Sequence, residues 1–158
     1  MKRILKGFSR LLVAVFAATS GAAFAQSGCE SLDAIPVTYQ ISYQAGIQGL
    51  FNTHCTECHE GDAPSGGLDL SGGISWSNLV YHESSQNSQL TRVLPNSPEL
   101  SLLFHKINCA TPELGHRMPL FRTPLTLEEQ ALIYDWIAGG APAVQLDEVF
   151  RAEFEIRN

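Results

Sequence analysis

The feature that most constrains this chain is a C-x-x-C-H pattern in its first half, Cys55-Thr56-Glu57-Cys58-His59. This pattern is typical of covalent attachment of c-type haem. The two thiols add across the porphyrin vinyl groups, and their spacing puts them on one side of a helical turn, facing one haem edge. His59 follows directly, so its imidazole can ligate the iron on the side where the chain is attached. We therefore predict one covalent haem c held by Cys55 and Cys58, with His59 as the proximal iron ligand.

Two other kinds of site use a C-x-x-C pair. A thioredoxin-like redox pair follows a strand in a βαβ unit, and the residues before Cys55 do not have that pattern. A structural zinc site brings a second Cys/His pair at short spacing, whereas the remaining cysteines, Cys29 and Cys109, are far apart and isolated. The sequence therefore favours haem attachment over both.

The first 25 residues have the organisation of a secretory signal peptide. Met1–Ala25 contains four basic residues and no acidic one, an apolar run at Leu11–Ala18 and a small-x-small cleavage site at Ala23-Phe24-Ala25. The apolar run is too short for a permanent membrane anchor. We predict cleavage after this site and export to the periplasm or a similar compartment, where haem is delivered and thiols are available for attachment. A lipoprotein signal with Cys29 as the lipidated residue is the alternative.

Removal of the signal peptide makes the chain strongly acidic. After Ala25 there are 6 basic and 16 acidic residues, a net charge of −10 with histidine neutral. This charge disfavours nucleic acid and anionic membrane as partners. It suits redox partner proteins with a basic docking face, although a solvated acidic surface explains it equally well. No later segment is long and apolar enough to span a membrane.

The mature chain, 26–158, has the size of a single domain, whose core we expect at about 37–142. Its two remaining cysteines, Cys29 and Cys109, lie in an oxidising compartment, and we predict a disulfide between them. Such a bridge would tie the N-terminal arm to the segment just before Met118. Two free thiols are the alternative.

Hydrophobic periodicity and capping residues predict an all-α fold of three to five helices with long loops. The apolar stripes of the three main helices are Tyr43, Ile47, Leu50 and Phe51; Leu100, Leu103, Phe104 and Ile107; and Leu127, Ala131, Tyr134 and Ile137. Ser97 and Pro98 are expected to begin the second of these helices. Thr126 and Glu129 form a capping box for the third, and Gly139 ends it.

The segments between these helices are expected to be mostly loops. Glu60–Gly73 is a glycine-rich loop, Trp76–Tyr81 a short helical turn, and Cys109–Pro124 an irregular segment. Val144–Ile156 is expected to form a short strand or an extended arm.

The order of these segments resembles a class I cytochrome c, and more narrowly the bacterial periplasmic cytochrome c domains with a glycine-leucine motif after the haem site. The matching segments, in the family order, are Leu50 to His59, Gly66-Gly67-Leu68-Asp69-Leu70, Pro98 to Leu103, Arg117-Met118-Pro119 and Trp136 to Ala141. The resemblance implies a class I cytochrome c-like fold around one covalently bound haem. It covers about Ile47–Pro142 and leaves out the Cys29 arm and the tail.

Two structural details follow from the resemblance. It implies that the N- and C-terminal helices cross and pack, near Gly46 or Gly49 and near Tyr134 or Trp136. It also implies that a backbone carbonyl around Pro64 accepts a hydrogen bond from the second ring nitrogen of His59, which would fix the tautomer of the ligand.

Met118 is the predicted distal iron ligand. It is the one methionine after the signal peptide, and it lies in a proline-bounded loop shortly before the last helix, where class I cytochromes carry their sixth ligand. A thioether is a soft donor that favours Fe(II) and raises the reduction potential relative to two histidines. A core methionine that fills a gap is the structural alternative.

Four histidines compete with Met118. His116, two residues away, is the main rival, whereas His82 and His105 are more distant, and His54 sits on the attachment side of the haem. Arg117, Trp76 and Tyr81 are candidates for contacts with the haem propionates, although packing and surface roles explain them equally well.

Iron held by His59 and Met118 has no open coordination position. The predicted function is therefore single-electron transfer between redox partners, not enzymatic catalysis. The alternatives are a haem-based gas-binding or sensing protein, which needs a displaceable ligand, and a haem subunit of a periplasmic oxidoreductase complex. No other catalytic constellation stands out, since Glu128, Glu129 and Asp135 are expected on the solvated face of a helix.

Overall fold

The fold is organised around α4, Leu127–Ala138, the helix with the strongest signals in the sequence. The structure is a computed structural model, and it describes residues 28–144. The Thr126 hydroxyl accepts a hydrogen bond from the Glu129 amide, and the Glu129 carboxylate accepts one from the Thr126 amide. The structure confirms this capping box and the end of α4 at Gly139.

The first helical segment begins at Tyr43, within the stretch that the apolar stripe marks. Tyr43–Ile47 (η1) is one π-helical turn that continues directly into α1, Gln48–His54. Ser42 has an extended backbone, and its hydroxyl accepts a hydrogen bond from the Ala45 amide. This side-chain cap separates the extended N-terminal arm from the helix.

The remaining elements include a small sheet that the sequence did not indicate. They are η2 (Ser65–Gly67), α2 (Ser75–Leu79), β1 (Glu83–Ser84), β2 (Asn87–Thr91), η3 (Pro98–Leu100) and α3 (Leu102–Asn108). β1 and β2 pair antiparallel, with Ser84 opposite Asn87. The expected all-α class therefore accounts for the helices but not for this hairpin, and residues 28–144 form a mixed fold of helices and one two-stranded sheet.

α3 begins four residues later than Ser97 and Pro98 predict. Pro98–Leu100 form only a 3₁₀ turn, and Ser97 makes no side-chain capping bond. The α-helix itself starts at Leu102. Leu100 is 67% exposed, so its assignment to the buried stripe was wrong, whereas Phe104 is buried.

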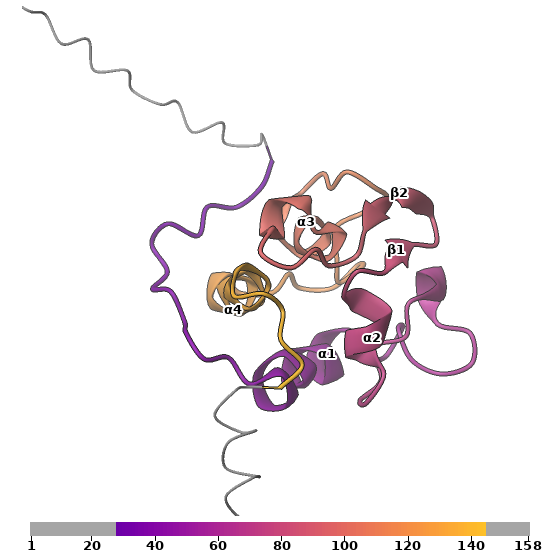
Figure 1. Ribbon diagram of the computed structural model, residues 1–158. Coiled ribbons are helices and arrows are strands. Elements are labelled where there is room, and N and C mark those ends of the chain that lie inside the picture. Colours follow the sequence, from indigo (N-terminus) through magenta and orange to yellow (C-terminus); the bar gives the residue numbers. More distant parts are fainter. Residues whose placement is uncertain (1–27, 145–158) are drawn as a thin grey trace, which may run out of the picture.

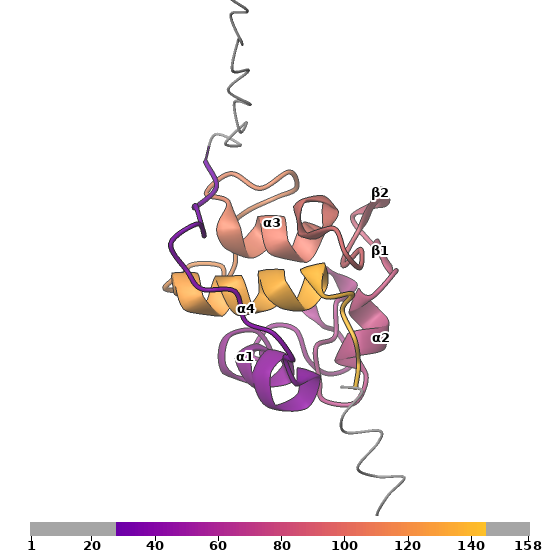
Figure 2. The ribbon, with the colours of Figure 1, turned by 60° about the vertical axis from the view of Figure 1, so that its left-hand side comes forward.

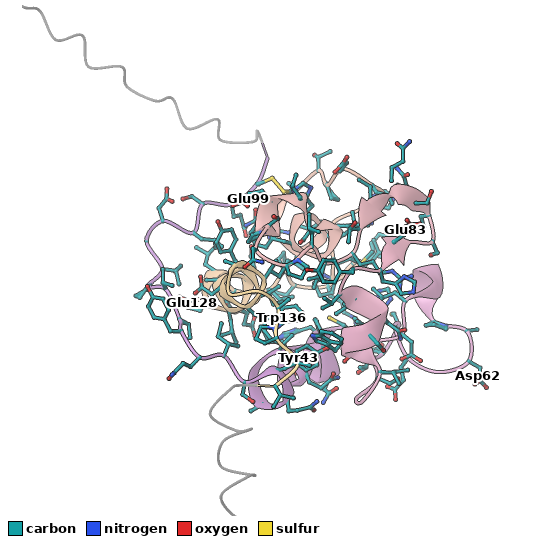
Figure 3. All side chains as sticks on the ribbon, in the orientation of Figure 1. Tyr43, Asp62, Glu83, Glu99, Glu128 and Trp136 are labelled. Atoms are coloured by element: carbon teal, nitrogen blue, oxygen red, sulfur yellow. A yellow bond between two sulfur atoms is a disulfide. The ribbon has the colours of Figure 1, made fainter. Side chains whose placement is uncertain are left out.

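α4 lies between α3 on one side and α1 with η1 on the other (Figures 1 and 2). The Tyr43 and Trp136 rings pack between α4 and η1 with their centroids 5.3 Å apart (Figure 3). Gly46 lies at the same crossing, since a Cβ there would be 3.7 Å from the Leu132 side chain, whereas nothing lies within 4 Å of a Cβ at Gly49. The resemblance implied a crossing near Gly46 or Gly49 and near Tyr134 or Trp136, and the structure places Gly46 and Trp136 there.

The N-terminal arm runs from residue 28 along α4 to η1 (Figure 2). The arm begins at a disulfide between Cys29 and Cys109, whose residues also pair as an isolated β-bridge directly after α3. The bridge joins positions 80 residues apart in the sequence. The arm and the end of α3 are thereby held together by a covalent bond.

Two segments with sequence predictions lie outside the described residues. These are the signal peptide, Met1–Ala25, and the tail after Val144 with its expected strand or arm. Among residues 28–144 no helix has the length and apolar character needed to cross a membrane.

Candidate functional site

The C-x-x-C-H motif opens onto a cavity of about 360 Å³, within the range of small-molecule and cofactor sites. Five parts of the chain form its walls: the end of α1 with the turn after it, η2 with the segment after it, the hairpin region, α3, and the irregular loop before α4. The apolar part of the wall consists of Leu68, Leu70, Leu102, Leu103, Ile107, Met118, Pro119 and Leu120. The walls also contain Cys55, Cys58, His59, His116 and Arg92. Residues separated by more than 60 positions in the sequence therefore meet at one site.

Both motif cysteines line this cavity as free thiols. α1 ends at His54, and the chain then makes a tight turn in which the Cys58 and His59 amides both donate to the Cys55 carbonyl, at 3.1 and 3.0 Å. Cys58 is exposed and Cys55 is half-buried, and burial raises the pKa of the Cys55 thiol to about 11. The element before the motif is a helix, so the strand that a thioredoxin-like pair requires is not found there.

A backbone carbonyl orients His59. Its Nδ1 lies 3.2 Å from the Leu68 carbonyl oxygen, and its own carbonyl accepts a hydrogen bond from the Leu70 amide at 2.7 Å. A proton on Nδ1 that donates to Leu68 leaves Nε2 as the nitrogen with a free lone pair, which is the tautomer a metal ligand needs. The expected acceptor was a carbonyl around Pro64, and the structure corrects this to Leu68, which belongs to the Gly66-Gly67-Leu68 stretch.

Met118 lies on the same cavity as His59. It is half-buried and packs against the hydrophobic core. Its amide donates to the Lys106 carbonyl at 2.6 Å, so the last turn of α3 holds the backbone of this loop. His59 belongs to the C-x-x-C-H motif and Met118 to the irregular loop before α4, and both side chains line the cavity.

The competing histidines differ in their surroundings. His116 also lines the cavity but is exposed. His54 lines it too, yet its Nε2 lies 2.9 Å from the Glu129 carboxylate of α4. The ring nitrogens of His105 face the Glu99 carbonyl and the Glu113 carboxylate, and His82 lies at the hairpin, outside the cavity wall.

Arg92 is a cavity residue that the sequence analysis missed. It is 7% exposed, and its guanidinium donates to the carbonyls of Asn78 at 2.7 Å and Gly67 at 3.0 Å. No carboxylate of residues 28–144 lies within 4.0 Å of it. Burial lowers the pKa of Arg92, because the charged form is less well solvated there. The one signal in the sequence is the rarity of basic residues, since only six follow Ala25.

Gly67 shows why this part of the glycine-leucine motif suits glycine. Its φ is +62°, in the left-handed region, and a Cβ there would lie 3.2 Å from the Ser85 hydroxyl. The turn directs the Gly67 carbonyl to Arg92. Two carbonyls of the motif thus bind residues of the cavity wall. The Gly67 carbonyl accepts from the Arg92 guanidinium, and the Leu68 carbonyl accepts from His59.

The three residues considered for propionate contacts lie away from the cavity wall. Arg117 pairs with Glu30, and the Trp76 indole donates to the Ala141 carbonyl. Tyr81 is 70% exposed. Within residues 28–144, none of these three side chains lines the cavity, whereas Arg92 does.

The donor set of the cavity can be compared with what a covalent haem requires. The wall offers two free thiols, an imidazole with an oriented Nδ1, a thioether, apolar side chains and a buried cation that lacks a carboxylate partner. Haem presents vinyl groups, an iron, an apolar ring and acidic propionates, and each has a matching group here. Within residues 28–144 no three His, Cys, Asp or Glu side chains gather to hold a metal ion, so the zinc interpretation gains no further ligands.

Comparison with protein-family models, curated proteins and solved structures gave no significant match to this chain.

Proposed function

We propose that this chain is an exported monohaem c-type cytochrome that carries single electrons between redox partner proteins. The observation that carries the proposal is the meeting of the C-x-x-C-H thiols, His59 and Met118 on one cavity with largely apolar walls. When bound, haem c supplies a one-electron Fe(III)/Fe(II) couple. A class I-type arrangement around one haem is part of the same proposal.

Each group of the cavity has a stated task in this proposal. Cys55 and Cys58 would hold the cofactor through thioether bonds. His59 would be the proximal iron ligand through Nε2, and its Nδ1 hydrogen bond to Leu68 orients the imidazole for that role. The apolar walls would exclude water from the porphyrin, which lowers the local dielectric constant and would favour the less charged iron state.

Met118 is the proposed distal ligand, and His116 is the alternative. The half-buried position of Met118, its packing against the core and the hydrogen bond from its amide to α3 support Met118. His116 is exposed at the cavity margin, where an imidazole is stable without a metal. A thioether and an imidazole would together fill both open positions of the iron, so electron transfer would need no ligand exchange.

The charge of Arg92 has a partner in this proposal. A buried cation without a nearby anion costs free energy, and the propionate carboxylates of haem are the anions that the bound cofactor brings. A charge-assisted hydrogen bond from the guanidinium would satisfy one of them.

The first experiment tests attachment. The full chain is expressed in a host that attaches haem to exported proteins, and its intact mass is measured. We expect removal of the signal peptide near Ala25 and the added mass of one haem. Cys55→Ala/Cys58→Ala is expected to lack that mass. A wild-type protein without added haem under these conditions would overturn the proposal.

The second experiment tests the distal ligand by absorption spectroscopy of the purified holoprotein. We expect a Met–Fe(III) charge-transfer band that is lost in Met118→Ala and retained in His116→Ala. Loss of the band in His116→Ala alone would reverse the assignment. Rapid carbon monoxide binding by the wild-type ferrous protein would favour the gas-binding function over a pure electron carrier.

A further inference from the structure

The loop that carries Met118 has few anchors of its own. Between α3 and α4 the chain from residue 109 to 126 contains no helix or strand. Three hydrogen bonds tie the Met118 region to the last turn of α3. The Met118 amide donates to the Lys106 carbonyl at 2.6 Å, Arg117 Nε donates to the Ile107 carbonyl at 3.1 Å, and Lys106 Nζ donates to the His116 carbonyl at 3.4 Å. The Lys106 and Ile107 carbonyls lie at the end of a helix, where no helical amide is left to bind them.

A further anchor comes from the N-terminal arm. The Glu30 carboxylate accepts hydrogen bonds from Arg117 at 2.7 Å and from the buried amide of Gln130 at 2.6 Å. These two bonds hold the pKa of Glu30 below its ordinary value, which means that the carboxylate stays charged near neutral pH. Glu30 therefore connects the residue beside Met118 to the body of α4.

The arm is itself fixed in place next to this residue. Cys29 precedes Glu30 and is joined to Cys109, directly after α3. The Glu30 backbone makes two hydrogen bonds with Asn108. The Glu30 amide donates to the Asn108 carbonyl at 3.3 Å, and the Glu30 carbonyl accepts from the Asn108 side chain at 3.0 Å. The covalent bridge and these bonds pre-position the carboxylate, so little freedom is lost when it binds Arg117.

We propose that Glu30 is a positioning residue for Met118, acting through Arg117, so that the disulfide-tethered arm controls how firmly the thioether is held on the cavity. This inference rests on the proposed function, because it concerns Met118 as the distal iron ligand. The arm lies outside the segments that resemble class I cytochromes. Control of the distal ligand by this arm is therefore a property of this chain's own residues.

The test measures how readily an added ligand displaces Met118. Imidazole is titrated into the ferric full-length holoprotein, and loss of the Met–Fe(III) band is followed. Glu30→Ala removes the acceptor for Arg117 and Gln130. We expect it to raise the apparent imidazole affinity about three- to tenfold, since one charge-assisted hydrogen bond changes an equilibrium by about that factor. Glu30→Gln keeps an acceptor oxygen and is expected to give a smaller increase.

Glu113→Ala is the matched control. Glu113 lies in the same irregular loop, carries the same charge and pairs with His105 at 3.7 Å, whereas Arg117 pairs with Glu30. The control alters net charge equally, and we expect its imidazole affinity to stay within twofold of wild type.

Global stability is measured in parallel by urea unfolding, because a merely structural role for Glu30 would lower stability without changing ligand displacement. Equal imidazole affinities for Glu30→Ala and Glu113→Ala would overturn the inference and leave the proposed function intact. If Glu30→Ala does not fold, Glu30→Gln decides, and an affinity equal to that of the control overturns the inference. A wild-type holoprotein without the Met–Fe(III) band would instead contradict the proposed function itself.

Discussion

At the residue scale, Arg92 is a buried, positively charged residue in the cavity wall. Arg92 is 7% exposed, and the hydrogen bonds of its guanidinium within residues 28–144 go to backbone carbonyls, so a positive charge lies next to the site. In the proposed holoprotein, a positive charge near the iron would favour Fe(II) over Fe(III), because the oxidised centre carries one more positive charge. Its removal is therefore expected to lower the reduction potential.

We predict that Arg92→Gln lowers the reduction potential of the holoprotein by an amount on the order of 50 mV, close to a tenfold change in a one-electron equilibrium. Potentiometric titration followed by absorption measures it. Arg92→Lys keeps the charge and serves as the control, with a potential close to that of wild type. An unchanged potential in Arg92→Gln would show that the charge of this residue does not act on the iron.

Single residues with a strong local signal were predictable from the sequence, and those defined by tertiary contacts were not. Cys55, Cys58 and His59 form a contiguous motif, so their common location follows from the backbone alone. Arg92 becomes a cavity residue only because the Gly66-Gly67 turn and α2 direct carbonyls toward it. The acceptor for His59 was placed near Pro64, and the actual choice of Leu68 depends on the path of the same turn.

At the element scale, the capping box of α4 is the clearest local device. The Thr126 hydroxyl and the Glu129 carboxylate satisfy amides that a helix leaves unbonded at its N-terminus. The same Glu129 carboxylate accepts from His54 at the end of α1. The cap thus stabilises α4 and connects it to the element that precedes the motif.

We predict that Thr126→Ala lowers the free energy of unfolding by about 1 kcal/mol, the usual cost of losing such a cap. Urea unfolding followed by far-ultraviolet circular dichroism measures the change. Thr123→Ala, at an exposed threonine of the preceding loop, is the control and should stay within about 0.5 kcal/mol of wild type. Equal stabilities for the two variants would mean that the cap contributes nothing measurable.

Helices with caps and apolar stripes could be predicted, and elements without them could not. α4 has both signals, and its predicted and observed bounds agree. Leu100 fits the periodicity of α3 but is exposed, because the chain makes a 3₁₀ turn there before the α-helix begins. β2 consists of Asn87-Ser88-Gln89-Leu90-Thr91, and a mostly polar strand at the surface shows no apolar alternation.

At the scale of the whole molecule, two tyrosines link stability to alkaline pH. Burial raises the pKa of Tyr43 to about 12, and the hydrogen bond from Tyr134 to the Glu99 carboxylate raises that of Tyr134 to about 12. Tyrosines of the unfolded chain ionise near pH 10. Their contribution to stability is therefore complete below pH 10 and is lost as the pH rises from about 10 to 12.

We predict that Tyr134→Phe reduces the fall in unfolding free energy between about pH 10 and 12, because one of the two linked groups is removed. Urea unfolding of the full chain at several pH values in this window measures the slope. Tyr81→Phe, at a position that is 70% exposed, is the control and should reproduce the wild-type slope. A slope in Tyr134→Phe as steep as that of wild type would contradict the linkage.

The disulfide acts on the molecule as a whole, since it closes a loop of 80 residues that contains η1, α1, the motif, the hairpin and α3. Loop-closure entropy for that length predicts a stabilisation of about 4–5 kcal/mol through the unfolded state, and native disulfides of small exported domains typically contribute about 2–5 kcal/mol.

Cys29→Ser/Cys109→Ser is therefore expected to lower the free energy of unfolding by at least about 2 kcal/mol in urea. Wild-type protein treated with a dithiol reductant is the matched comparison and should lose a similar amount, while the reductant should leave the double variant unchanged. A double variant as stable as untreated wild type would contradict a stabilising bridge. Because the bridge also fixes Glu30 beside Arg117, the double variant should further show the higher imidazole affinity expected of Glu30→Ala, which would link global stability to Met118 as the proposed distal ligand.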